Sequence, residues 1–178
     1  LLRVEAQPPE PDALRGAYER LALTLKGDQP LGPSLDALYG VVCSRCGAAT
    51  PSDTLTWEQG ASSPALADYA CAACGHRARE APVQPASPTP VDPLGFHRRL
   101  VAERLRTAGG HERLIQRLLA LYTPRNLYAL TVIQLKLELL YADSPLLDPL
   151  RACLLDAMEQ ASALHMPEIG RASCRERV

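Results

Sequence analysis

The sequence of 178 residues lacks the marks of several large protein classes. No apolar run reaches the roughly 18 to 20 residues that span a bilayer, so we expect no membrane contact. Leu1 and Leu2 are followed at once by charged residues and prolines, which is not the pattern of a secretory signal. The formal net charge of -1 gives no global signal of a self-sufficient nucleic-acid binder. DNA binding through another part of a larger protein stays open.

Two further absences concern the start of the chain and its glycines. The chain does not begin with Met, which favours an internal piece of a longer protein. Its length suits one domain, or a small domain plus an insert. No Gly-rich phosphate or cofactor cradle is found, because Gly109-Gly110 alone predicts only a turn.

The clearest positive feature is a pair of Cys-x-x-Cys motifs. Cys43/Cys46 and Cys71/Cys74 are separated by 24 residues, and each pair is followed by Gly. Two thiolates with two residues between them can wrap a tight turn around one metal ion, and two such turns complete a tetrahedral sulfur site. A closed site of this kind is typical of structural zinc and leaves no open position for chemistry. The motifs predict a zinc ribbon over residues 41–80, and metal-bound thiolates predict a reducing, cytoplasmic location.

Alternatives stay open for several ribbon residues. A dithiol redox pair is the other interpretation of each motif, although two pairs at ribbon spacing argue against it. His76 could replace a ligand, but four cysteines already saturate the site, so a surface or outer position is expected. Trp57, the only tryptophan, is expected to pack against the metal-binding turns. Base stacking is the alternative for Trp57, but one aromatic residue is not a stacking platform.

Helices are predicted on both sides of the ribbon, from apolar residues at helical spacing and from capping residues, Pro or Gly at the ends. The expected fold class is helical with a small β part: a four-cysteine zinc ribbon inserted between helical segments, and an all-helical C-terminal half. The segments are an N-terminal strand and helix segment (1–40), the ribbon (41–80), a Pro-rich linker (81–92), a helical region (93–167) and a tail (168–178). The predicted elements outside the ribbon are a strand over 1–6 and helices over 11–27, 34–39, 93–108, 111–120, 124–141 and 144–164.

The last eleven residues, 168–178, resemble the translation of a common sequencing-library adapter without interruption. We therefore predict that this tail is an artefact without a selected fold and that Cys174 carries no function. An ordinary basic tail is the alternative. Cys153, in contrast, lies among leucines and is predicted to be a small buried hydrophobic residue.

Arg125 is the candidate for a polar contact with substrate, cofactor or DNA. Thr123 is a good helix cap and Pro124 a good first residue, so Arg125 falls in the first turn. A cation there opposes the helix dipole by roughly 0.3 to 1 kcal/mol unless an anion compensates. The expected partner is therefore an anion, and a structural salt bridge that fixes the helix start is the alternative. The arginines of the predicted helix 93–108 could also face phosphates, but nearby glutamates favour a solvated face.

Several short motifs stand in a specific order. Leu38-Tyr39 precedes the first cysteine pair, a strand with Trp57 lies between the pairs, and Tyr69 precedes the second pair. The segment 121–127, Leu-Tyr-Thr-Pro-Arg-Asn-Leu, then opens a leucine-rich helix. In this order the motifs resemble, over residues 35–165, the middle of bacterial adenine-specific DNA methyltransferases that contain a zinc ribbon.

The resemblance implies an S-adenosylmethionine-dependent enzyme that methylates an exocyclic base amine. It places the Gly-rich cofactor loop upstream of Leu1 and the Asp-Pro-Pro-Tyr motif downstream of Pro167, and neither is in this sequence. The expectation is an interior fragment that has no catalytic or cofactor-binding residue, is inactive alone, and meets DNA and a flanking catalytic domain in the full-length protein. The alternative is a non-enzymatic zinc-ribbon adaptor that binds protein or nucleic acid through its helical part.

Overall fold

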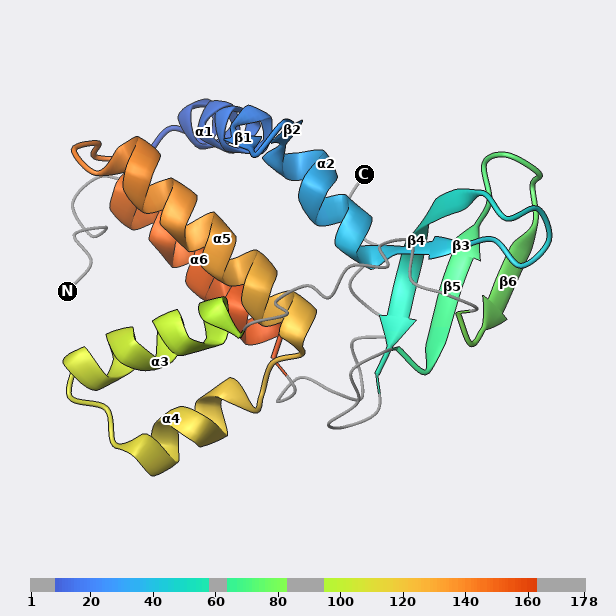
Figure 1. The fold of residues 1–178 in the computed structure, drawn as a ribbon. Coiled ribbons are helices and arrows are strands. Elements are labelled where there is room, and N and C mark those ends of the chain that lie inside the picture. Colours follow the sequence, from blue (N-terminus) through green and yellow to red (C-terminus); the bar gives the residue numbers. More distant parts are fainter. Residues whose placement is uncertain (1–8, 58–63, 83–94, 163–178) are drawn as a thin grey trace.

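The computed structural model describes residues 9–57, 64–82 and 95–162. It confirms the expected fold class, because the chain forms helices and a small antiparallel sheet, and the four cysteines cluster in the connections between the strands of that sheet. Figure 1 shows the helices gathered on one side of the molecule and the sheet on the other. The predicted strand over 1–6 and the tail 168–178 lie outside the described residues, and so does most of the linker 81–92.

The described strands form two antiparallel sheets, and the described helices lie before and after the larger sheet in the sequence. The four-stranded sheet has the order β3-β4-β5-β6 with every neighbouring pair antiparallel, and β1 and β2 form a separate short hairpin. The helices are α1 (Pro11–Leu23), α2 (Leu31–Asp36), the 3-10 helix η1 (Ala37–Tyr39), α3 (Phe96–Thr107), α4 (Glu112–Leu119), α5 (Pro124–Tyr141) and α6 (Leu147–Gln160). The strands are β1 (Leu25–Lys26), β2 (Gln29–Pro30), β3 (Gly40–Val42), β4 (Ala49–Thr56), β5 (Leu66–Ala70) and β6 (Arg77–Glu80).

The N-terminal helices differ from the prediction at their ends. The first helix ends at Leu23 rather than near Gly27, because the chain turns there into the β1–β2 hairpin. Gly27, with φ 62°, supplies the left-handed residue of that hairpin turn. The second helix begins at Leu31, three residues earlier than predicted, and the hydroxyl of Ser34 donates to the carbonyl of Pro30 instead of capping the helix start. Gly40 begins β3.

The C-terminal helices match the prediction more closely. α5 spans the predicted residues, and the Thr123 side chain accepts a hydrogen bond from the Asn126 amide, as expected of a helix cap. α3 begins at Phe96 instead of Pro93, because Gly95 has φ 62° and no α-helix continues through that conformation. α6 begins at Leu147 rather than at Ser144.

Three separate apolar cores follow from this arrangement. The largest lies among α1, α2, α5 and α6, and a smaller one lies between α3, α4 and the start of α5. α5 contributes to both cores, which explains why its sequence is apolar on most sides; near its end, Leu139 and Leu140 are nevertheless exposed. The third core belongs to the ribbon. The members of the largest core are Ala17, Leu21, Leu31, Tyr128, Leu130, Val132, Leu137, Tyr141, Leu150 and Leu154.

Candidate metal centre and its junction with the helices

The four predicted ligands, Cys43, Cys46, Cys71 and Cys74, come together in one cluster. Their sulfur atoms all lie within 4.8 Å of one another. The Sγ atoms of Cys43 and Cys74 are 3.8 Å apart, and those of Cys46 and Cys71 are 3.6 Å apart. A tetrahedral zinc ion with Zn–S bonds of about 2.3 Å would hold its sulfurs about 3.8 Å apart. The cluster could therefore hold one metal ion, and its dimensions fit four-thiolate zinc.

Two turns with the same backbone hydrogen bonds bring the sulfurs together. The amide of Gly47 donates to the carbonyl of Cys43, and the amide of Gly75 donates to that of Cys71, both over 2.9 Å. Gly47 and Gly75 have φ of 71° and 69°, a region that only glycine enters without strain. The glycine after each cysteine pair therefore helps to turn each Cys-x-x-Cys segment around a common centre.

The thiols of the cluster differ in acidity. Burial raises the pKa of the Cys43 thiol, but the backbone amides of Cys46 and Arg45 and the neighbouring thiols outweigh burial, and the pKa falls to about 6. At Cys46 the amide of Ala48 lowers the pKa, while the thiols around it and burial raise it, to about 12 overall. Amide donors thus favour one thiolate, and the close sulfurs resist further negative charge. A bound cation would offset that resistance.

The buried side chain of Tyr69 supports the first Cys-x-x-Cys turn, whereas the sequence motif indicated only its position before the second cysteine pair. Tyr69 is 3% exposed, and its hydroxyl donates to Glu80 Oε1 over 2.7 Å and accepts from the Ser44 amide over 3.0 Å. Hydrogen bonds from the hydroxyls of Ser44 and Tyr69 lower the pKa of the Glu80 carboxyl. These contacts connect β5 and β6 with the residue that follows Cys43. His76 lies outside the sulfur cluster, half-buried, with its ring edge-to-face against Tyr69.

Trp57 does not pack against the metal-binding turns, so that expectation is wrong. It follows the last residue of β4, and that strand begins just after the first turn, so eight extended residues carry Trp57 roughly 25 Å away from the sulfurs. Its partner is Arg125, whose guanidinium carbon lies 5.5 Å from the centroid of the indole ring. The tryptophan therefore faces the helices at the opposite end of the ribbon.

Arg125 lies at the place where the ribbon meets the helices. It is only 7% exposed, and its Nη1 donates to the carbonyl oxygen of Leu38 over 2.7 Å. The hydroxyl of Tyr39 donates to Asn126 Oδ1 over 2.9 Å. We call the five residues Leu38, Tyr39, Trp57, Arg125 and Asn126 the junction.

At the junction, neutral groups contact the buried guanidinium group of Arg125. Burial lowers the pKa of Arg125, and the Tyr39 hydroxyl opposes this effect. Among the described residues the partners of Arg125 are a carbonyl and an aromatic ring, whereas an anion was expected. A carbonyl oxygen and an indole face both attract a cation, which is how a helix start tolerates arginine here. The predicted contact of Arg125 with DNA or substrate remains a prediction.

Cys153 is only partly buried, which differs from the expectation of a buried hydrophobic residue. It lies against Tyr18, where burial first and then the Cys153 thiol raise the pKa of the tyrosine. Cys174 lies outside the described residues. Cys153 is not part of the sulfur cluster, so the site assignment for the four ribbon cysteines is unaffected.

Comparison with protein-family models, curated proteins and solved structures finds no match to this chain. Within the described part of the chain, no helix combines the length and apolar character that crossing a membrane requires. The geometry of the sulfur cluster and of the junction is therefore the basis for a functional proposal.

Proposed function

We propose that this chain is the zinc-ribbon and helical part of an S-adenosylmethionine-dependent DNA (adenine) methyltransferase. The observation that carries the proposal is the junction. Leu38-Tyr39 and Arg125-Asn126 belong to the two motifs that flank the ribbon in the resemblance, and they lie 87 residues apart. Two hydrogen bonds connect the motifs: Tyr39 donates to Asn126 over 2.9 Å, and Arg125 donates to the Leu38 carbonyl over 2.7 Å. This pairing gives a physical reason for the two motifs to occur together in one chain.

In this proposal the metal is zinc, held by Cys43, Cys46, Cys71 and Cys74. Four sulfur ligands in tetrahedral array suit zinc or iron, and a closed set without an open position suits a structural ion. The zinc ion would supply folding energy to the ribbon and no chemistry. The amides and Tyr69 described above would orient its ligands.

The role of the chain in the enzyme is to hold the ribbon rigidly against the helices. The resemblance assigns the Gly-rich cofactor loop and the Asp-Pro-Pro-Tyr motif to other parts of such an enzyme. S-adenosylmethionine and the target adenine would bind there, and DNA would bind to the whole protein. Residues 1–178 alone would therefore transfer no methyl group.

The test uses the complete reading frame that contains this sequence. The purified protein is incubated with DNA and S-adenosylmethionine labelled in the methyl group, and the nucleosides are separated. We expect label in N6-methyladenine from the full-length protein and none from residues 1–178. A folded, zinc-loaded full-length protein that leaves DNA unlabelled would contradict the proposal and favour the adaptor alternative.

A further inference from the structure

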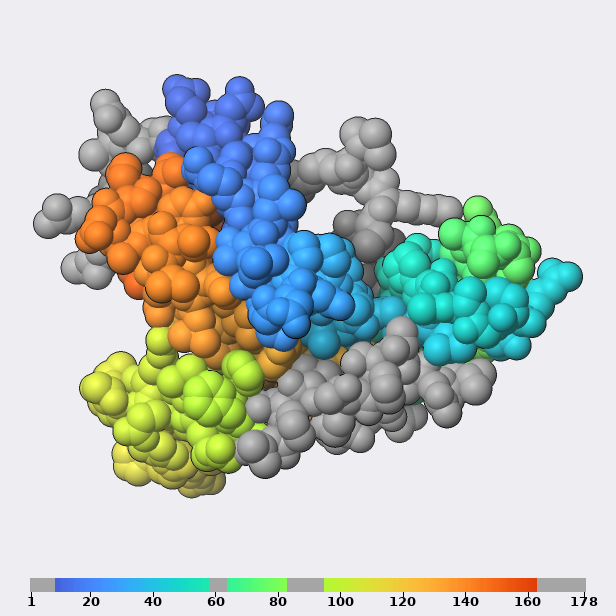
Figure 2. Space-filling model, turned by 45° about the horizontal axis from the view of Figure 1, so that its top comes forward, coloured from blue at the N-terminus to red at the C-terminus, as the bar shows by residue number. Residues whose placement is uncertain are grey.

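The hairpin of α3 and α4 concentrates positive charge in a chain that is nearly neutral. Residues 96–120 contain six arginines and two glutamates, without lysine or aspartate, which leaves a formal charge of +4. The whole chain has a charge of -1, so the other residues sum to -5. Figures 1 and 2 show this hairpin at one end of the molecule, with α4 on the outside of α3.

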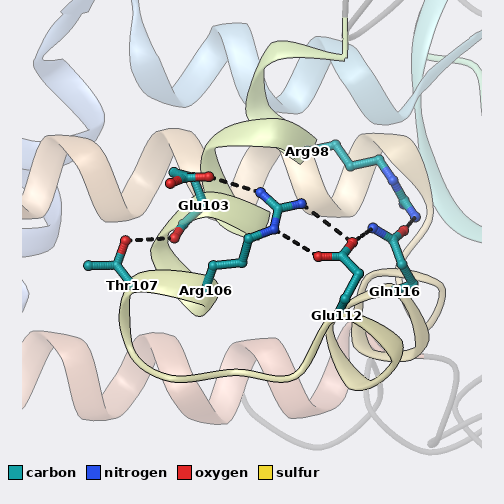
Figure 3. Close-up of polar contacts among 6 residues, drawn as sticks. All are labelled: Arg98, Glu103, Arg106, Thr107, Glu112 and Gln116. Carbon is teal, nitrogen blue, oxygen red and sulfur yellow. Dashed lines mark hydrogen bonds and ion pairs between the residues drawn. The ribbon is translucent and has the colours of Figure 1, made fainter.

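Two of the six arginines connect α3 with α4. Figure 3 shows Arg106 of α3 between Glu103 and Glu112, with ion pairs of 2.9 and 2.8 Å. Arg98 donates to Gln116 Oε1 and to the carbonyl of Leu119, both over 3.3 Å. These contacts connect the two helices along one side.

A third arginine fixes the hairpin to the helical bundle. Arg104 makes two hydrogen bonds of 2.9 Å to the carboxylate of Glu138 on α5, one to each oxygen. Paired hydrogen bonds of this kind fix orientation as well as distance. The hairpin is therefore a rigid platform attached to the bundle.

Two further arginines take no part in this network. Ile115 and Leu119 are the buried residues of α4, and Arg113 and Arg117 lie on the opposite side of the same helix. Both arginines are exposed, and neither makes a hydrogen bond or ion pair within the described part of the chain. They are four residues apart, about 6 Å along the helix axis. The outer face of α4 thus presents two adjacent cations on a rigid support.

We propose that Arg113 and Arg117 bind the phosphate backbone of duplex DNA, with the α3–α4 hairpin as the platform. We choose DNA as the partner because of charge. The planar guanidinium group suits phosphate oxygens, and a local charge of +4 attracts a polyanion. This inference rests on the proposed function and names the surface through which this part of the enzyme meets its substrate. Leu114 and Leu118, also exposed beside the arginines, would suit an acidic protein instead, and the test includes that outcome.

The experiment measures binding of residues 1–178 to a fluorescent DNA duplex by anisotropy over a series of salt concentrations. We expect Arg113→Gln/Arg117→Gln to weaken binding about tenfold at low salt and to reduce the salt slope by about 1.8, which corresponds to two lost phosphate contacts. The control, Arg15→Gln/Arg20→Gln, removes the same charge from exposed positions of α1. It should change binding less than about twofold, because α1 is not part of the platform.

Three results would overturn the assignment: no DNA binding by the parent at low salt, equal losses in the two double variants, or arginine-dependent binding of poly-glutamate without binding of DNA. The methylation assay keeps this proposal distinct from the proposed function. If the full-length enzyme methylates DNA and the Arg113/Arg117 variant has an unchanged KM for DNA, the hairpin assignment is wrong and the proposed function stands. If DNA binding depends on the hairpin but no methyl group is transferred, the proposed function is wrong and the hairpin assignment stands.

Discussion

The ribbon and the helical part differ in what holds them together. The buried ribbon core has five residues, and two of them, Cys43 and Cys71, are candidate metal ligands. The largest helical core has ten buried residues, most of them leucine, alanine or tyrosine, and more apolar side chains pack against it. A unit of about 40 residues buries too little apolar surface to be stable without a metal ion, disulfides or a partner. We therefore expect a bound metal ion to stabilise the ribbon, whereas apolar burial stabilises the helices.

Loss of the metal should have the largest effect and should separate the two regions. We expect Cys46→Ala to unfold residues 41–80, because a structural zinc contributes on the order of 10 kcal/mol to a small module. The helices should remain folded, since their cores contain none of the four ligands. Amide hydrogen exchange resolved by residue would measure both regions at once.

The matched control for that variant is Cys153→Ala, which removes a thiol from α6 and leaves the cluster intact. It should retain protection throughout the ribbon. Loss of protection in the helices of Cys46→Ala, to the same extent as in the ribbon, would show that the two regions fold as one unit.

A cavity in the helical core should destabilise the helices and leave metal binding by the ribbon unchanged. Leu150 is 1% exposed, and Leu150→Ala should lower the free energy of unfolding of the helices by about 2 to 5 kcal/mol. Leu155→Ala on the same helix removes a side chain that is 54% exposed, and it should cost much less. Denaturant unfolding followed by circular dichroism gives both values. Metal affinity, measured by competition with a chelator, should be the same in both variants; a matching loss would contradict independent stabilisation.

The junction should couple the two regions by a smaller amount. Arg125→Ala removes the hydrogen bond to the Leu38 carbonyl and the contact with Trp57, and should cost about 1 to 3 kcal/mol. Trp57 is the only tryptophan, so its fluorescence reports this site alone. We expect its emission to shift in Arg125→Ala and to stay unchanged in Arg104→Ala, whose arginine pairs with Glu138. Unchanged emission in both variants would mean that Arg125 does not hold Trp57 in solution.

The same variants in the full-length protein would test a functional role for Arg125. If the role of Arg125 is purely structural, Arg125→Ala should reduce methyl transfer only in proportion to the loss of folded protein. If Arg125 also contacts DNA or the catalytic domain, Arg125→Ala should lose activity well beyond its effect on melting temperature. Arg104→Ala should then lose little activity.

The smallest expected effect concerns pH and the α3–α4 hairpin. Hydrogen bonds from Arg106 first, and then from Gln116, lower the pKa of Glu112 from 4.5 to about 2. Because the pKa is lower in the folded state, this carboxylate stabilises the hairpin fully above its ordinary pKa. That contribution is lost as the pH falls from about 4.5 to about 2. An NMR titration of the carboxyl carbon should give a midpoint near 2 in the parent and a clearly higher one in Arg106→Gln; equal midpoints would exclude the ion pair in solution.

Features that depend on neighbouring residues were predictable from the sequence. The cysteine spacing and the following glycines predicted the cluster, because the hydrogen bonds that close each turn join residues at most five apart. Thr123 and Pro124 predicted the start of α5 for the same reason. The role of each glycine was less predictable. Gly27 and Gly95 both have positive φ, but only the structure shows whether a glycine ends a helix, turns a hairpin or precedes a helix.

Contacts between distant residues were not predictable. Arg125 finds the Leu38 carbonyl across 87 positions, and no local pattern marks a backbone carbonyl as a partner. The supporting role of Tyr69 depends on Ser44, which is 25 positions away. The position of Trp57 follows from the length and direction of β4, which the sequence does not give with enough accuracy.

X-ray absorption at the zinc edge, combined with elemental analysis of protein purified under reducing conditions, determines whether the four ribbon cysteines bind one zinc ion. We expect one zinc ion per chain with four sulfur ligands at about 2.3 Å, and no bound zinc in Cys46→Ala. Protein without zinc, or zinc with nitrogen or oxygen ligands in place of the four sulfurs, would contradict the claim that Cys43, Cys46, Cys71 and Cys74 form a closed structural zinc site.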